Sequence, residues 1–591
     1  MEKKLCSKLC QITDRKLEHK HTVLIASLLI ILKFIIVMGH RTVIMPHAYH
    51  DDVLFFSLAS SITEGNWLGP YNQLTLAKGV FFPLWLAFLN AFSIPLLIGN
   101  QALYTLACLF FVYSLRPILK SKIAQLICFA FLLYNPITLG EMQMLRILRD
   151  GIYHSLVMFV FAGFIGMFLY RDDVKKMRIF SLICGLNFAF AWHTREDTFF
   201  VLPFVIAASV AIMLFSLFEN KDKKTIKQVI LQKTFIRKVL FIALPFLFIF
   251  ASNQIVAGIN NAWYGRHVVN DFRSSCFQSA YGALSRIAHD EFYFQIPVPE
   301  DARMRAYEVS PAFNELRQFL DDDGSQTWWK VLGGPRNDFY GGWFFWALRN
   351  AVAEAGYYEH PLYAREFYER LAREINDAID EGLLPAQAGR RSTLAPPFTR
   401  RHIVPTLEAT VEAIKFVSNF ERFYISFTHQ QQEPHFGAHY AQRIRNMEIY
   451  THQLSSYNSH ETNAYSRFNM FKFRISNWIL NIYRFISPPL TSLSLLTLLL
   501  LTISTIRSLV KKSAPLFYRE VIVLWGLLLI FILRAFMVAF VHISSFFAIS
   551  HHYLATNYFT LIAFNVIAIV CLITYVKSMV ARSIVKRNAA I

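Results

Sequence analysis

The sequence TVLIASLLIILKFIIVMG, residues 22–39, is an apolar run of 18 residues whose one charged member is Lys33. Shortly after it comes HAYHDDVLFF, residues 47–56, with two adjacent acidic residues. A run of about 20 apolar residues is long enough to cross the hydrocarbon core of a bilayer as a helix. Asp51 and Asp52 therefore lie just beyond the first predicted membrane crossing.

The composition is that of a membrane protein. Of 591 residues, 54% are hydrophobic and only 17% are charged, which lies outside the range of soluble globular proteins. The 56 Phe and 26 Tyr residues suit lipid-facing helices and aromatic belts at the membrane surface. The predicted fold is an all-α multispanning membrane protein with about ten transmembrane helices. These are expected at 22–39, 97–115, 123–140, 151–170, 179–194, 198–218, 239–257, 487–506, 518–540 and 553–576.

The net charge of +19 is concentrated in short connections and near the two ends of the chain. With the N-terminus inside, alternate connections are rich in lysine and arginine, as cytoplasmic loops are. We therefore expect cytoplasmic N- and C-termini. The run at 22–39 is too long for a signal-peptide core and lacks a small-residue cleavage site, so we expect it to be retained. The basic stretches are 3–20, 116–122, 171–178, 220–238, 507–512 and 577–587.

One apolar stretch is predicted not to cross. KGVFFPLWLAFLNAFSIPLL, residues 78–97, is short and is bracketed by Pro83 and Pro95. Counting it as a span would move the next basic connection to the outer side, against the charge rule. We expect a juxtamembrane or re-entrant helix here.

A long polar insertion separates the seventh and eighth predicted spans. Residues 258–486 carry charges of both signs, turn signals and helical patterns, and we expect a mainly α extracytoplasmic domain. The chain then divides into a membrane module at 1–257, with a catalytic outer loop at 40–96, this domain, and 487–591 as C-terminal helices and tail. The insertion is nearly free of lysine, which argues against nucleic acid as a partner. Its one cysteine, Cys276, excludes a disulfide framework there.

Ionisable residues gather at the predicted outer ends of the spans. Such groups are costly at a membrane boundary unless they are paired or face water, so they form a functional-site hypothesis by default. They occur in four separate outer connections, while the inner connections carry mainly solvated lysine and arginine. The stretches are HAYHDD at 47–52 with Lys78, GEMQMLRILRD at 140–150, HTRED at 193–197 and HISSFFAISHHY at 542–553.

Each stretch also has a purely structural interpretation. Asp51 could be the N-cap of an amphipathic helix, with Asp52 favoured by the helix dipole. Arg146 and Arg149 could extend to lipid headgroups. The residues at 195–197 could form a self-neutralising turn. Paired histidines near a membrane surface are more often interfacial than catalytic, which applies to His551 and His552.

The order of these motifs resembles the C-type (GT-C) glycosyltransferases, which use polyprenyl-phosphate-linked sugars. The nearest likeness is to protein O-mannosyltransferases and to the aminoarabinose transferase of lipid A. That family has one span followed by an acidic residue or pair at the head of a juxtamembrane helix that ends in Gly, which HDDVLFFSLASSITEG, residues 50–65, resembles. AKGVFFPLWLAF, residues 77–88, is similar to its second juxtamembrane helix, and Asp150 in RILRDGIY matches its Asp at the fourth span.

The likeness covers roughly the first 220 residues, and the chain departs from the family in three respects. The family's K-P-P-L is KGVFFPL here, and an Arg-Tyr pair near the last outer loop is replaced by His551, His552 and Tyr553. The outer domain precedes the last three spans rather than following them. The resemblance therefore implies the reaction class and a GT-C-like fold but not the acceptor.

Transfer from a lipid phosphate requires a base for the acceptor and cations for the phosphate leaving group. Asp51 is the first choice for the base and Asp52 the second, because repulsion between them would raise one pKa. Lys78, Arg146 and Arg149 are candidates for the lipid phosphate. The other candidate substrate contacts are Asp150, Arg195, Glu196, His551 and His552, with Arg474, Arg484 and Arg534 as weaker cations near the later spans.

A divalent metal, Mg²⁺ or Mn²⁺, is left open, since Asp51, Asp52, Asp150 and Asp197 would supply oxygen ligands. The expected function is a transferase that moves a sugar from a polyprenyl-phosphate donor to an extracytoplasmic glycan, lipid or protein. The alternatives are a transporter or flippase of a lipid-linked saccharide, and a noncatalytic scaffold. The expected location is a bacterial inner membrane, with membrane lipids as further partners.

Overall fold

The computed structural model describes residues 18–218, 226–322, 325–330, 337–425, 438–456 and 463–589. Every regular element within those ranges is a helix, and β pairing occurs there only as isolated bridges. The all-α prediction is therefore confirmed for the described chain. The predicted basic residues at 3–16 and 221–224 lie outside the described residues.

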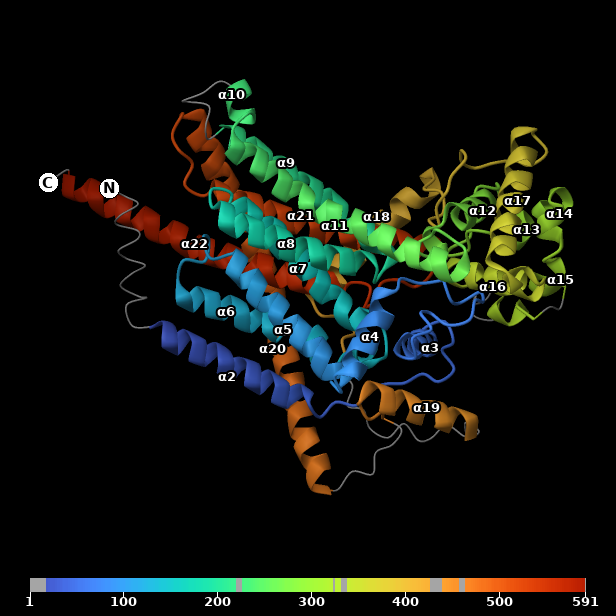
Figure 1. Cartoon of the computed structure of the whole chain (residues 1–591). Helices are drawn as coiled ribbons and strands as arrows, with labels where there is room; N and C mark the ends of the chain where they lie inside the picture. Colours follow the sequence, from blue (N-terminus) through green and yellow to red (C-terminus); the bar gives the residue numbers. More distant parts are fainter. Residues whose placement is uncertain are drawn as a thin grey trace.

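A bundle of long helices forms the membrane part (Figure 1). Eight helical segments of the described chain are long and apolar enough to cross a membrane. The other two predicted spans fall short: α6 has 12 residues, and α8 opens with three cations in its first turns. The ten helices are α2 (His19–Val37), α5 (Leu96–Ser114), α6 (Lys122–Leu133), α7 (Asp150–Leu169), α8 (Val174–Trp192), α9 (Leu202–Phe218), α11 (Lys233–Tyr264), α20 (Asn463–Val510), α21 (Tyr518–Ser544) and α22 (Ala555–Ala589).

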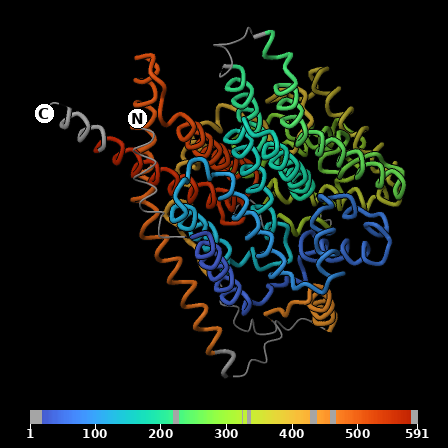
Figure 2. The backbone as a smooth tube through the Cα atoms, turned by 60° about the vertical axis from the view of Figure 1, so that its left-hand side comes forward, coloured from blue at the N-terminus to red at the C-terminus, as the bar shows by residue number. Residues whose placement is uncertain are grey.

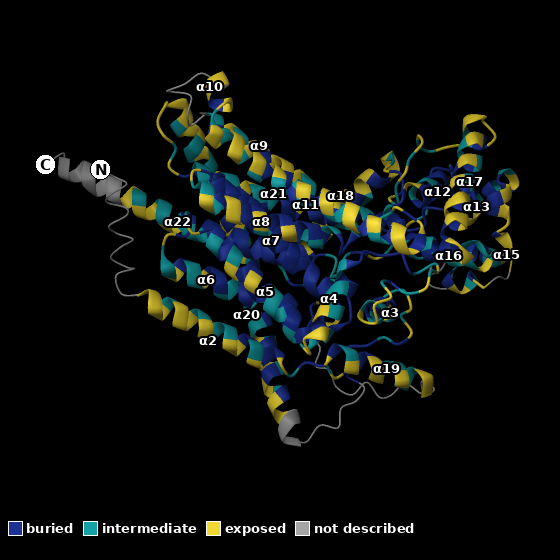
Figure 3. Ribbon diagram, viewed as in Figure 1, coloured by how far each residue is buried: buried dark blue, intermediate teal, exposed yellow. Residues whose placement is uncertain are grey.

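Helix α7 is the centre of this bundle. All 20 of its residues are buried, because α5, α8, α9 and α22 pack around it. The outer helices expose apolar side chains instead, as α2 does along most of its length (Figure 3). A helix that is apolar on all sides suits either environment, so burial by neighbours, rather than composition, separates α7 from α2. Figure 2 shows α20 as one long helix that passes beside α2.

Two short helices follow α2 at the end of the bundle that carries the polar insertion. Helix α3 (Asp52–Thr63) and helix α4 (Phe81–Ala91) pack against each other. With 11 residues, α4 is too short to cross the bilayer. The stretch 78–97 is therefore not a span, in agreement with the sequence prediction.

The basic connections lie together at one end of the bundle. In Figure 1 the start of α2, the end of α22 and the short helix α10 (Ile226–Ile230) are at the left, and the polar insertion is at the right. The α5–α6, α7–α8 and α20–α21 connections are also at the left end. One end of the bundle is thus lysine-rich, and the opposite end carries the polar insertion.

The polar insertion has a hydrophobic core of its own, which runs from Phe272 to Leu384. Its aromatic residues fill the space between short helices, and Ala77 from the first outer loop joins the same core. Its elements are η4 (Asp271–Arg273), α12 (Ser275–Ser285), α13 (Glu300–Val309), α14 (Pro311–Asn314), α15 (Arg317–Leu320), α16 (Gly341–Glu354), η6 (Tyr357–Glu359) and α17 (Pro361–Asp380). We call this part the outer domain.

The rest of the insertion returns to the bundle. Helix α18 (Arg400–Ser418) packs along α21, and α19 (Ala438–Thr451) packs on α4. Phe416 and Met447 belong to the same core as α7. The compact outer domain is therefore shorter than the predicted 258–486, because α11 continues to Tyr264 and α20 begins at Asn463.

Candidate functional site

Charged side chains from distant parts of the chain meet at the end of the bundle that carries the polar insertion, which we call the outer end. They come from the loop before α3, the turn before α4, the segment from η2 (Met142–Leu145) to the start of α7, η3 (Glu196–Val201), η4 and α21. We call this set the outer ion network. Its members are Asp51, Asp52, Lys78, Arg146, Arg149, Asp150, Arg195, Glu196, Asp197, Arg273 and Arg534.

Asp51 pairs with Lys78. The Lys78 Nζ lies 2.5 Å from Asp51 Oδ1 and also donates to the backbone oxygen of His50. Asp51 occupies the N-cap position of α3, yet its side chain makes no capping hydrogen bond. The structural interpretation of Asp51 as a cap is therefore not realised. Its partial burial would raise its pKa, but the ammonium of Lys78, together with the charges of Arg146 and Arg149, more than offsets that effect and holds the pKa of Asp51 well below its usual range.

Asp52 pairs with Arg146 in the interior. The Asp52 side chain is 0% exposed, and it accepts a hydrogen bond from the Arg146 guanidinium and one from the Met45 backbone N–H at 3.3 Å. Burial raises the pKa of Asp52, Arg146 opposes the rise and the charge of Asp51 adds to it. The repulsion expected from the sequence thus acts on Asp52, whereas the pKa of Asp51 is lowered.

Arg149 and Glu196 tie the start of α7 to the turn before α4. Arg149 Nη1 lies 2.7 Å from Glu196 Oε2 and donates to the Thr194 carbonyl at 3.1 Å. Glu196 Oε1 also accepts from the Gly79 backbone N–H at 3.1 Å. This close approach needs glycine, because a Cβ at Gly79 would lie 2.2 Å from the carbonyl oxygen of His193. The contact fixes the position of Lys78, the preceding residue.

The remaining members form a chain of alternating charges. Arg195 contacts Asp150 and donates from Nε to Asp197 Oδ1 at 2.9 Å. Arg534 Nη1 binds Asp197 Oδ2 at 2.8 Å, and its Nη2 donates to the Tyr553 carbonyl at 2.8 Å. Residues 195–197 are therefore more than a self-neutralising turn, since both acidic residues and the arginine also bind partners outside it.

The two histidines near the last helix differ in their surroundings. His551 has both ring nitrogens engaged, with the Tyr558 hydroxyl at 2.7 Å and the Arg422 carbonyl at 3.1 Å. His552 packs against Tyr553 with the two rings tilted and their centroids 4.1 Å apart. Burial lowers the pKa of His552 to about 4, against the attraction of Asp150. His552 is therefore neutral near pH 7 and lies close to the outer ion network, whereas His551 holds the structure together.

The weaker cation candidates also separate. Arg534 is a full member of the outer ion network. Arg484 instead donates to the backbone oxygens of Phe420 and Phe423, and Arg474 is exposed on α20. Only Arg534 of the three is placed to act with the other candidates.

No protein-family model, curated protein or solved structure matches the chain. Within the described ranges the outer ion network holds six cations against five carboxylates, which leaves one formal positive charge. An anionic ligand suits that balance.

The carboxylates do not fit a metal site. Within the described chain no three His, Cys, Asp or Glu side chains converge as metal ligands do. Asp51, Asp52, Asp150 and Asp197 each bind an arginine or lysine instead. The oxygen donors proposed for Mg²⁺ or Mn²⁺ are thus already committed to cations of the protein.

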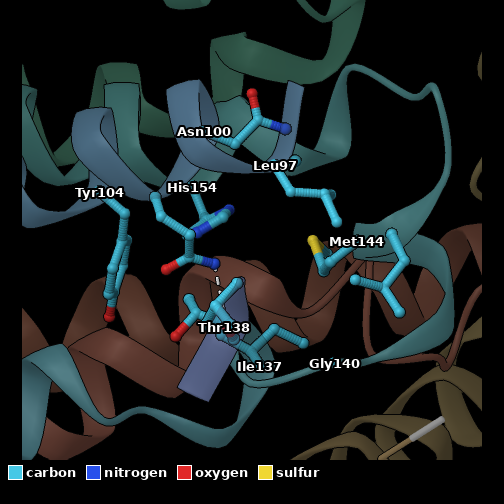
Figure 4. A pocket seen from close by; sticks show the side chains of 12 residues that line it. Leu97, Asn100, Tyr104, Ile137, Thr138, Gly140, Met144 and His154 are labelled. Atoms are coloured by element: carbon cyan, nitrogen blue, oxygen red, sulfur yellow. Dashed lines mark hydrogen bonds between the residues drawn. The ribbon is translucent and has the colours of Figure 1, made fainter. Parts of the chain in front are cut away.

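A small polar cavity lies behind the outer ion network, between α2, α5 and the start of α7 (Figure 4). Its volume is about 20 Å³, enough for about one water molecule. The Thr138 carbonyl in its wall accepts from Gln101 at 2.9 Å and from the buried Lys33 amine at 3.1 Å. The buried His154 Nε2 and Asn100 Nδ2 have no protein partner among the described residues. The cavity suits a structural water and is too small for a sugar.

The sequence did not predict one member of the site, Arg273, and indicated another, Arg534, only as a weaker candidate. Arg273 donates to the Arg195 and Glu196 carbonyls at 3.0 and 3.3 Å and lies 4.3 Å from the Trp192 ring centroid. It sits in the polar insertion, where arginine is common and gives no signal. Arg534 did carry a signal, because it is a lone charge inside an apolar run.

Proposed function

We propose that the protein is an integral membrane glycosyltransferase that moves a sugar from a polyprenyl-phosphate-linked donor to an acceptor at the outer end of the bundle. The observation that carries this proposal is the state of Asp51. Its side chain is 42% exposed, the highest value among the carboxylates of the outer ion network, and Lys78 is its ion-pair partner. An accessible carboxylate beside a buried cation supplies both a base and a phosphate contact.

In the reaction, Asp51 removes the proton of the acceptor hydroxyl as that oxygen attacks the anomeric carbon of the donor sugar. The bond between this carbon and the phosphate oxygen breaks, and its electron pair stays on the phosphate. The products are the glycosylated acceptor and polyprenyl phosphate. A single displacement of this kind inverts the anomeric configuration and needs one base.

In this proposal Lys78 and Arg149 hold the lipid phosphate. Lys78 lies next to the half-exposed Asp51 and Arg149 next to the partly buried Glu196, and negative charge grows on the phosphate oxygen as the sugar leaves. The formal positive excess of the outer ion network favours that anion. Arg146 is committed to the buried Asp52, so its role is to hold the loop that carries Asp51.

Donor binding would also activate Asp51. The free carboxylate is a weak base, because Lys78 lowers its pKa. A phosphate bound beside Lys78 draws the ammonium away from Asp51, and the pKa of the carboxyl then rises. The base thus gains strength only when the donor is present, which limits wasteful proton transfer.

The test is turnover in vesicles. Purified protein is reconstituted with a radiolabelled undecaprenyl-phosphate sugar and an envelope extract as the source of acceptor, and the release of free lipid phosphate is followed. We expect release that depends on both protein and extract. Movement of the labelled lipid between leaflets without release of lipid phosphate would support a flippase and contradict the proposal. Absence of both movement and release would also contradict the proposal.

A further inference from the structure

A stack of tryptophans from the outer domain stands beside Asp51. Trp328 and Trp329 stack with ring centroids 3.9 Å apart, and Trp329 stacks on Trp343 at 5.0 Å. His50, next to Asp51 in the chain, has its ring 5.4 Å from Trp329 and 4.4 Å from Trp346. We call Trp328, Trp329 and Trp343 the tryptophan shelf.

His50 and Trp346 join the shelf to the outer ion network. The His50 ring contacts both Trp329 of the shelf and Trp346, and His50 precedes Asp51 in the chain. Lys78 Nζ lies 5.5 Å from the Trp346 ring centroid and 2.5 Å from Asp51 Oδ1. A ligand that reaches Asp51 from the aqueous side has the shelf next to it.

The inner and outer members of the shelf differ in exposure. Trp329 is 3% exposed and belongs to the core of the outer domain, whereas Trp328 is 54% exposed. Core packing explains Trp329 but leaves the cost of a large exposed aromatic at Trp328 unexplained. A rigid stack with one face in water offers contact area with little loss of side-chain entropy on binding.

Hydrogen-bonding groups surround the same stack. Gln326 Oε1 accepts from Trp329 Nε1 and from Asn350 Nδ2, both at 3.1 Å. Gln326 Nε2 donates to Glu354 Oε1 at 2.7 Å, and the exposed Ser325 also contacts Glu354. Amide, hydroxyl and carboxylate groups are thus grouped beside an aromatic face, with one formal charge among them.

We infer that the tryptophan shelf binds a sugar ring of the acceptor, so that the acceptor is a saccharide chain. This inference rests on the proposed transferase function for the role of the bound sugar. One face of a pyranose carries C–H groups with partial positive charge, which pack on the electron-rich face of an indole. Its hydroxyls at the ring edge match the exposed Ser325 hydroxyl and Glu354 carboxylate, which the buried Gln326 holds in place through its own hydrogen bonds.

Other acceptor classes fit the shelf less well. A lipid acceptor needs a continuous apolar surface, and the neighbours of Trp328 include the exposed Ser325 and the carboxylate of Glu354. A phosphorylated ligand at this place would be repelled by Glu354. From His50, the neighbour of Asp51, ring contacts pass through the buried Trp329 to the exposed Trp328, which suits a chain with one sugar at the base and another on Trp328.

The experiment measures glycan retention by the full chain in nanodiscs. The probe is the pool of fluorescently labelled glycans released by mild acid from the envelope of the cells that make the protein. After gel filtration, glycans retained by the protein are separated and measured. We expect the wild type to retain at least one species and Trp328→Ala to retain it at least about tenfold less.

Two variants control this measurement. Trp328→Phe keeps an aromatic face and is expected to retain most of the bound glycan. Trp263→Ala removes a similarly exposed tryptophan on α11, 51% exposed, and is expected to match the wild type. Equal retention by Trp328→Ala and the wild type, or no retained glycan in the wild type, would overturn the inference.

Failure of the inference can be told apart from failure of the proposed function. If the wild type releases lipid phosphate and Trp328→Ala does so with an unchanged KM for the envelope acceptor, the shelf is not an acceptor site and the transferase proposal stands. If the wild type retains a glycan but releases no lipid phosphate, the shelf binds sugar and the transferase proposal fails.

Discussion

Two neighbouring aspartates have opposite surroundings at the scale of single residues. Asp51 is half exposed beside Lys78, and Asp52 is fully buried against Arg146. Lys78 lowers the pKa of the first, and burial raises the pKa of the second. The sequence shows them as one acidic pair, but one is suited to chemistry and the other to holding the loop.

Replacing Lys78 with methionine tests the electrostatic coupling to Asp51. The pKa of Asp51 should rise, because burial remains while the attraction of the ammonium is lost. In the wild type, the pH at which kcat/KM falls to half on the acid side should lie below the ordinary aspartate pKa of about 3.9. In Lys78→Met this midpoint should move upward into the measured pH range. The measurement is the initial rate of lipid-phosphate release between about pH 4 and pH 8.

The charge-conserving variant Lys78→Arg serves as the control and should leave the acid-side midpoint in place. If the acid-side midpoint of the pH profile is the same in Lys78→Met as in the wild type, Asp51 is not the titrating base. This holds even if the variant is slower overall.

The main effect of Asp52→Ala should be a lower free energy of unfolding, because Asp52 holds the loop and is not the proposed base. Removing one partner of a buried ion pair leaves the Arg146 charge uncompensated, at a cost of about 3–5 kcal/mol. Thermal unfolding in detergent should show the loss, and the double change Asp52→Ala with Arg146→Leu should recover part of it. A single variant as stable as the wild type would show that the pair contributes little to holding the loop.

At the scale of the elements, the turn before α4 positions the site. Gly79→Ala should lower the free energy of unfolding by about 1–3 kcal/mol, because its Cβ would meet the His193 carbonyl at 2.2 Å. Turnover should fall as well, since the turn carries Lys78. Thermal unfolding and lipid-phosphate release measure the two effects.

Gly258→Ala is the matched change on α11, where an added Cβ meets nothing within 4 Å. Its stability should equal or exceed that of the wild type, because alanine favours a helix. If both glycine variants behave alike, the close approach at residue 79 does not matter.

Much of the element order was predictable, because apolar runs and basic connections report the membrane directly. The charged candidates were also visible, since ionisable groups at a membrane boundary are costly. Their pairing was not: Asp52 and Arg146 are 94 residues apart in the chain, and no local pattern encodes such a contact. The packing of α18 on α21 was missed for a related reason, because its Pro405 and its charged residues resemble a soluble helix.

At the scale of the whole molecule, the two ends of the bundle must face opposite sides of the membrane, with the lysine-rich end inside and the outer ion network outside. Glu64 is exposed at the C-terminal end of α3, and Ser513 is exposed at the lysine-rich end. The described native cysteines are all buried, so single cysteines can be introduced once Cys6 and Cys10 are changed to serine. In sealed cells an impermeant maleimide should label Glu64→Cys, and Ser513→Cys only after the membrane is opened. Labelling of both from the same side would contradict this arrangement.

The burial of the outer ion network also belongs to this scale. The charges neutralise one another only when six parts of the chain are folded together. These parts are α3, the turn before α4, α7, η3, η4 and α21. The site is therefore a property of the assembled bundle and outer domain together. Neither part alone holds the complete set of partners.

The most direct test of the central claim is the rate of lipid-phosphate release by Asp51→Asn in reconstituted vesicles. Loss of the base should lower the rate by at least about 100-fold. The variant also removes the ion-pair partner of the buried Lys78, so some loss of stability is expected, and the rate is compared at a temperature where thermal unfolding shows the protein to be folded. Asp173→Asn is the matched control. Asp173 caps α8 at the lysine-rich end of the bundle, and the variant should retain the wild-type rate, since asparagine caps a helix equally well. Undiminished release by a folded Asp51→Asn protein would contradict the account.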